Sequence, residues 1–216
     1  MHTSSRRSAV CALGLLLSVS PVFGSMLATG GTLYPAPLEA NPAPGVVIYS
    51  TGSVPFVAAT FTGSLTSAVI AGDPTNPLGG LTFVYRVTNN AGSPNDIGRL
   101  TVVDFTGWLT DASYDNVSPV APLPAAGTVA PALINRSTPD VVGFSFLGIP
   151  IGPGTLAPGK TSMWLVVQTN APTWKTTIAS VIDGSVAMVP SVGPAPEPAT
   201  LLFFGAGAVA LLRRRS

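Results

Sequence analysis

The chain has 216 residues, of which 46% are hydrophobic and only 9% are charged, and it contains 23 Gly and 22 Pro. Its formal net charge of +1 depends on five arginines in the first seven and the last four residues, so residues 25–196, with five basic and eight acidic side chains, carry a net charge of −3. A body without a basic surface lacks the charge that binds phosphate backbones, so we expect no nucleic-acid partner.

The first 24 residues have the layout of a secretory signal peptide. Arg6 and Arg7 precede an apolar run from Ala9 to Leu17, and small and polar residues follow up to Gly24. A basic region, a short apolar region and a small-residue cleavage region are the three parts of such a signal. We therefore predict export through the Sec translocon and removal of residues 1–24.

Removal of this segment also removes the residues that most enzymes use for catalysis. His2 is the only histidine and Cys11 is the only cysteine. Without them, neither a Ser-His-Asp nor a Cys-His arrangement can form, and zinc sites built from His or Cys are excluded. The seven aspartates and Glu39 could supply a pair of carboxylates for a glycosidase, but nothing in the sequence marks two of them. We expect no catalytic residue, no metal and no cofactor in a protein that is not an enzyme.

The body, residues 25–190, shows the alternation of strands. The run from Leu81 to Thr88 alternates bulky and polar residues and ends at Asn89-Asn90-Ala91-Gly92, which has the composition of a turn. The other predicted strands are residues 45–50, 54–61, 64–70, 99–105, 129–134, 141–146, 162–169, 175–182 and 185–189. About ten short strands separated by Gly and Pro predict an all-β fold, a single antiparallel β-sandwich.

Three segments are poor in strand pattern. Residues 29–44 contain four prolines and are predicted to be an extended lead-in or a covering edge. Residues 119–131, rich in Pro, Ala and Gly, are predicted to form a long surface loop. Residues 190–196 contain three prolines and are predicted to be a spacer that leaves the sheet.

Two groups of residues in the body are candidates for binding. Asp111, Asp115 and Asn116 place oxygen atoms close together in a predicted loop, as an extracellular calcium site would, although Asp and Asn are also common turn residues. Trp108 and Trp174 lie near predicted strand ends, where an exposed ring could contact a glycan. Trp164 lies within an alternating run, which favours a place in the core.

The C-terminus is a cassette of three parts. Pro196, Glu197, Pro198 and Ala199 come first, an uncharged run of fourteen residues continues to Leu212, and Arg213, Arg214 and Arg215 follow. As a helix the run would measure roughly 21 Å, short of the roughly 30 Å of a bilayer core, and thinning of the bilayer or snorkelling arginines would meet the difference. Arginines beside a membrane segment resist translocation and would stay in the cytoplasm. A buried terminal helix is the alternative, but the run has no polar stripe to face water.

This cassette resembles the PEP-CTERM sorting signal of bacterial exported proteins, in which a Pro-Glu-Pro motif precedes a short transmembrane segment and a basic tail. The resemblance covers Pro196 to Arg215, within a predicted C-terminal region of residues 191–216 that also includes the proline-rich spacer. It implies an exosortase, a membrane-embedded protease, as processing partner, with transient anchoring in the inner membrane. It also implies a final place at the cell envelope, the cell surface or the extracellular matrix of an exopolysaccharide-producing bacterium. We expect a non-enzymatic surface or biofilm-matrix protein; the alternative is a secreted module that binds extracellular polysaccharide through Trp108 or Trp174.

Overall fold

The computed structural model describes residues 25–38, 45–117, 119–147 and 155–196, and these residues form twelve strands and no helix. The first six in chain order are β1 (Ser25–Met26), β2 (Thr32–Leu33), β3 (Val46–Val57), β4 (Thr62–Ala71), β5 (Thr82–Asn89) and β6 (Arg99–Val102). The other six are β7 (Thr110–Asp115), β8 (Leu133–Asn135), β9 (Val142–Ser145), β10 (Trp164–Thr169), β11 (Trp174–Asp183) and β12 (Ser185–Pro194). The predicted signal peptide and the predicted C-terminal helix lie outside the described residues.

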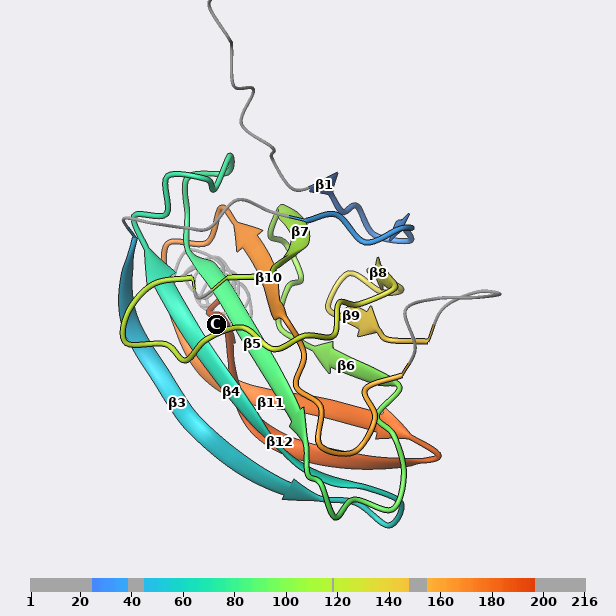
Figure 1. Cartoon of the computed structure of the whole chain (residues 1–216). Helices are drawn as coiled ribbons and strands as arrows, with labels where there is room; N and C mark the ends of the chain where they lie inside the picture. Colours follow the sequence, from blue (N-terminus) through green and yellow to red (C-terminus); the bar gives the residue numbers. More distant parts are fainter. Residues whose placement is uncertain (1–24, 39–44, 118, 148–154, 197–216) are drawn as a thin grey trace, which may run out of the picture.

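The strands form two antiparallel sheets of six (Figure 1). The first sheet has the order β1-β7-β10-β5-β4-β3, and the second has the order β12-β11-β6-β9-β8-β2. The all-β, antiparallel class that the sequence predicts is therefore confirmed, and the arrangement of the two sheets fits a sandwich.

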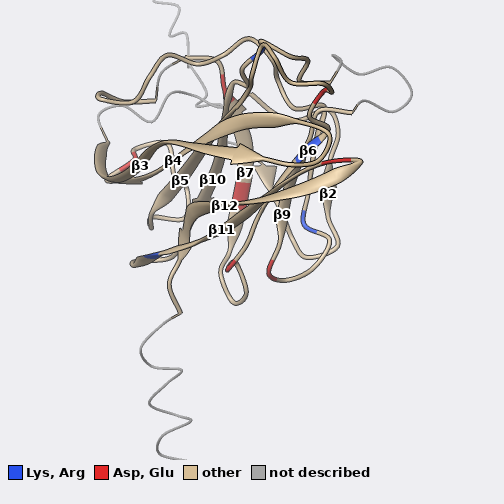
Figure 2. Cartoon of the chain, turned by 90° about the horizontal axis from the view of Figure 1, so that it is seen from below, with Lys and Arg blue, Asp and Glu red and all other residues tan. Residues whose placement is uncertain are grey.

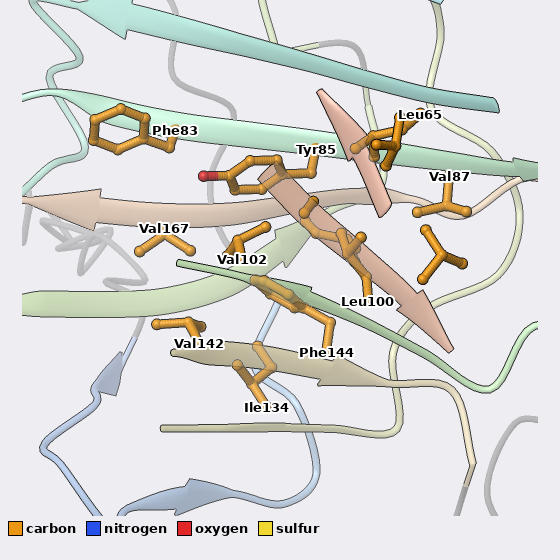
Figure 3. Packing of buried hydrophobic residues seen from close by; sticks show 14 of the residues in the cluster. Leu65, Phe83, Tyr85, Val87, Leu100, Val102, Ile134, Val142, Phe144 and Val167 are labelled. Atoms are coloured by element: carbon orange, nitrogen blue, oxygen red, sulfur yellow. The ribbon is translucent and has the colours of Figure 1, made fainter. Parts of the chain in front are cut away.

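The main core lies between the two sheets. Phe83, Tyr85 and Val167 from the first sheet and Leu100 and Phe144 from the second are fully buried in one apolar cluster. Figure 3 shows their side chains pointing toward one another across the space between the strands. These residues alternate along their strands with residues of the opposite face, as the pleat of a strand requires.

One long strand replaces two predicted ones. The sequence predicts separate strands at residues 45–50 and 54–61, with Thr51-Gly52-Ser53 between them. β3 instead continues through this stretch, from Val46 to Val57. The pairing with β4 shifts register between Ser50 and Ser53, and Gly52 has a φ of 65°. An irregularity with a left-handed glycine keeps the strand in the sheet while bending it.

The central strands of the first sheet are buried on both faces. All six residues of β10 are buried, and β5 is nearly as buried. Residues 119–131 pass over the outer face of this sheet (Figure 1), where Leu123 packs in a second apolar cluster with Val84 and Trp164. This segment has no strand, as predicted for a loop, and the strand predicted at residues 129–134 begins only at Leu133. The segment covers the sheet instead of standing free in solvent.

Residues 25–38 add a short strand to one edge of each sheet. β1, which precedes the predicted lead-in, pairs with β7, and β2 pairs with β8. The carbonyl of Pro37 accepts a hydrogen bond from the N–H of Tyr114 at 2.9 Å. Of the two alternatives predicted for residues 29–44, the described part therefore forms a covering edge. Edge strands of two residues offer little template for pairing with another chain.

Candidate functional site

The last strand carries the chain directly to the start of the C-terminal cassette. β12 pairs with β11 along its whole length, from Ser185 opposite Asp183 to Pro194 opposite Trp174. The prediction that residues 190–196 leave the sheet as a spacer is wrong for residues 190–194. β12 lies at the edge of its sheet, where a proline can be tolerated because the missing N–H need not serve a neighbouring strand.

The C-terminal half of β12 is held firmly by the body. Residues 191–194 are buried, the Tyr85 hydroxyl donates to the carbonyl of Val192 at 2.9 Å, and the hydroxyls of Ser67 and Ser191 are 3.0 Å apart. A Cβ on Gly193 would lie 2.8 Å from the carbonyl oxygen of Val103, so only glycine allows this close approach. Burial raises the pKa of Tyr85 well above its ordinary value, with a smaller contribution from Asp104. The hydroxyl therefore stays protonated and can donate.

The chain leaves the body immediately after this strand. The N–H of Ala195 donates to the carbonyl of Thr173 at 3.1 Å, and Pro196, the first residue of the predicted motif, is exposed. The other predicted residues, Glu197, Pro198, Ala199 and Arg213 to Arg215, lie outside the described residues. Ala199 is five positions after Pro194, and even a fully extended chain spans no more than about 17 Å over that distance. The apolar run of the cassette therefore begins close to the body.

A shallow depression of about 630 Å³ lies beside this exit. It is lined by Val103, Asp104, Lys175, Thr176, Thr177, Ile178 and Pro190. Lys175 Nζ lies 2.8 Å from Asp104 Oδ1, and the hydroxyl of Thr177 donates to the other oxygen of Asp104. Asp104 itself has a φ of 77° and donates its N–H to Asp140 Oδ1 at 2.9 Å. The acid and the base of the depression are thus paired with each other, and they fix the loop after β6 against β11.

The candidate glycan-binding tryptophans lie in different surroundings. Trp108 is only 6% exposed, which leaves little of its ring open to a sugar. Trp174 is half-buried and packs on Tyr49 of β3, with ring centroids 4.3 Å apart and an angle of 32° between the ring planes. Trp164 is fully buried, as predicted, and its Nε1 donates to the carbonyl of Pro124 at 3.1 Å.

The stretch predicted to be a calcium-binding loop is a strand up to Asp115, and only Asn116 lies beyond the strand, where it is exposed. Asp111 and Asp115 belong to β7, and together with Ser113 they form its outward face. The prediction of a loop is wrong. It relied on the preference of Asp and Ser for turns, whereas here these residues alternate with inward residues such as Ala112 along a strand. No group of three or more His, Cys, Asp or Glu that could hold a metal is found among the residues that the structure describes.

These polar residues of β7 are nevertheless buried. Four of their side-chain oxygen atoms, counting one of a neighbour, find no hydrogen-bond partner in the described part of the chain: Asp111 Oδ1, Ser113 Oγ, Asp115 Oδ2 and Gln168 Oε1. Gln168 lies on β10, directly opposite Asp111. Burial raises the pKa of Asp111 and of Asp115 to about 6, and the N–H of Val117 partly opposes the shift of Asp115. The alternation of polar residues from Asp111 to Asp115 was the signal that could have predicted this strand.

The edge strand β12 of the β-body leads straight into the short terminal cassette. One comparison with known proteins identifies this cassette. The model of the family described as PEP-CTERM protein-sorting motif matches residues 194–216, so the match begins at the last residue of β12. No curated protein and no solved structure matches the chain.

The chain therefore carries a PEP-CTERM protein-sorting motif, as its sequence predicts. This motif implies processing by an exosortase and export to the cell envelope or surface. In the residues that the structure describes, no helix is long and apolar enough to cross a membrane. The apolar run of the cassette lies beyond those residues.

Proposed function

We propose that the chain is a non-enzymatic β-sandwich of the cell surface or biofilm matrix in an exopolysaccharide-producing bacterium. The signal peptide leads it through the Sec translocon, the apolar run and Arg213 to Arg215 hold it in the inner membrane, and an exosortase then removes the tail. The observation that carries this proposal is the direct passage of β12 into the matched motif at residues 194–216.

The chemistry of the body supports a structural role. After loss of residues 1–24 it has neither histidine nor cysteine. Asp104 is paired with Lys175, and the remaining surface carries few charges (Figure 2). A surface protein needs a stable fold and an exit for its tail. β12 is paired with β11 along its whole length and leads the chain out of the body at its end.

The test uses the two glutamates of the chain as a matched pair. Glu197 lies within the motif and Glu39 in the lead-in segment, and the sequence has no other glutamate. The full chain is expressed in a host with an exosortase, and its intact mass is measured. We expect Glu197→Gln to accumulate with its tail, while Glu39→Gln is processed like the wild type. Equal processing of both variants and of a chain without residues 196–198 would contradict the proposed sorting.

A second candidate function is binding of extracellular polysaccharide. The half-buried pair of Tyr49 and Trp174 favours it, because stacked rings at a surface can contact a sugar face. Trp174→Ala should then weaken retention of the protein on polysaccharide from its host, whereas Val57→Ala, at a 78% exposed position, should not. No retention of the wild-type protein would rule this function out.

A further inference from the structure

The outward face of the β11–β12 hairpin is apolar and open. Three cross-strand pairs form it: Ile178 with Pro190, Ser180 with Met188, and Ile182 with Val186. Ile178 is 53% exposed, Val186 54% and Met188 73%. We call these six residues the hairpin face. Large apolar side chains gathered on one exposed sheet surface commonly mark an interaction site.

Charge is nearly absent from this surface. Between Trp174 and Pro194 the only charged residues are Lys175 and Asp183, one at each end of the hairpin. Figure 2 shows the long hairpin almost entirely in the colour of uncharged residues. Beside the hairpin face, Arg99 of β6 lies opposite Ile182, and its guanidinium donates to Asn135 Oδ1 at 2.5 Å. A partner bound here must be recognised through apolar contact, because none of the six residues of the hairpin face is charged.

The position of the hairpin face relative to the tail indicates which partner this is. Pro190 is four residues before Pro194, or about 13 Å along the strand. The apolar run at Ala199 begins within about 17 Å of the same residue, Pro194. A bilayer that holds residues 199–212 therefore lies within reach of Ile178 and Pro190.

We propose that the hairpin face rests on the lipid surface of the membrane while the tail is inserted. This inference rests on the membrane anchoring included in the proposed function. The short connection after Pro194 keeps the hairpin at a high local concentration near the bilayer, so even a modest apolar contact is occupied. Ile178, Met188 and Val186 enter the boundary between headgroups and acyl chains.

This contact orients the body before processing. With the hairpin lying flat, the depression beside Lys175 and the exit at Pro196 face the membrane, where an exosortase acts. Removal of the tail ends the local concentration effect, and the contact is then too weak to retain the body. A single cut would thus free the body from both its tail and its contact with the membrane.

The test measures where two labelled positions lie in the exported chain, residues 25–216. This chain lacks the predicted signal peptide and with it Cys11, so Met188→Cys and Val57→Cys can each be labelled with an environment-sensitive fluorophore. Both positions are exposed, at 73% and 78%, so neither substitution should disturb folding. The chain is reconstituted through its tail into phosphatidylcholine vesicles, with and without brominated acyl chains.

We expect a blue shift and quenching by bromine at position 188, and neither at position 57. Ile178→Asp in the Met188→Cys background should remove most of the quenching, because a carboxylate is costly at the acyl boundary. Equal, unquenched signals at both positions would overturn the proposal. A blue shift that depends on protein concentration and needs no vesicles would overturn it in favour of a second copy of the chain. Processing of the wild type in its host is measured separately. If the tail is removed there but position 188 does not contact lipid, this inference fails while the proposed sorting stands.

Discussion

The outer faces of the two sheets contain similar apolar residues but differ in what covers them. On the first sheet, Val84 and Trp164 are fully buried, and residues 119–131 lie over them. On the second sheet, Ile178 and Met188 are 53% and 73% exposed, and no described residue packs over them as residues 119–131 do on the first sheet.

This difference indicates that the two faces have different roles, one in the stability of the fold and one in interaction with a partner. The apolar residues of the first face are part of the folded core, since they gain their burial from the chain itself. Those of the second face gain less burial from folding, and they lie on the hairpin that ends at the sorting motif. We therefore expect substitutions on the first face to change the free energy of unfolding and those on the second to change membrane contact.

The largest effect is expected at Trp164. Trp164→Ala removes a fully buried ring and its hydrogen bond to the carbonyl of Pro124, and it should lower the free energy of unfolding by about 3–5 kcal/mol. Urea unfolding of the full chain followed by circular dichroism measures this loss. A loss below about 1 kcal/mol would mean that residues 119–131 do not cover this face in solution.

The covering segment itself can be tested at Leu123. This side chain is 8% exposed, and Leu123→Ala should cost about 2 kcal/mol, less than a fully buried leucine because the segment can adjust. The same urea experiment on Val186→Ala, on the hairpin face, is the matched control and should show almost no change. Similar losses for the two variants would remove the distinction between the faces.

A smaller effect of opposite sign is expected at Asp111, at the edge of the covered face. Burial raises its pKa from 3.8 to about 6, so folding favours its protonated form. The stability that this protonation contributes is complete below pH 4 and is lost as the pH rises through 6. Asp111→Asn should therefore raise the free energy of unfolding at pH 7 by on the order of 1 kcal/mol and flatten its dependence between pH 4.5 and 7. Asp183→Asn, at the hairpin turn, is the control, and a destabilised Asp111→Asn would show that the buried carboxylate has a partner.

The smallest effect on stability is expected at Met188. Met188→Ala should change the free energy of unfolding by no more than about 0.5 kcal/mol, because the side chain is 73% exposed. The same variant should weaken membrane contact in the vesicle assay, read from a fluorophore at Val186→Cys. A clear loss of stability would show that the hairpin face packs against another part of the chain.

Local pattern was enough to predict most of the strands and the sorting signal. Alternation from Leu81 to Thr88 predicts β5, and the cassette from Pro196 to Arg215 is contiguous, so its three parts can be recognised without a fold. The predicted all-β class followed from the same alternation. These features depend on residues that are neighbours in the sequence, and a sequence pattern describes such neighbours directly.

The tertiary structure decided the features that depend on residues distant in sequence. Pro190 and Pro194 could join a strand only because β12 lies at a sheet edge and β11 pairs with it. Asp111 and Asp115 lie in a strand whose polar face is buried, although their composition suggests a turn. Whether an apolar side chain such as Val84 or Met188 belongs to the core or the surface depended on the path of residues 119–131. The physical reason is that burial is set by what packs on top of a residue, and a sequence pattern gives only the face on which it lies.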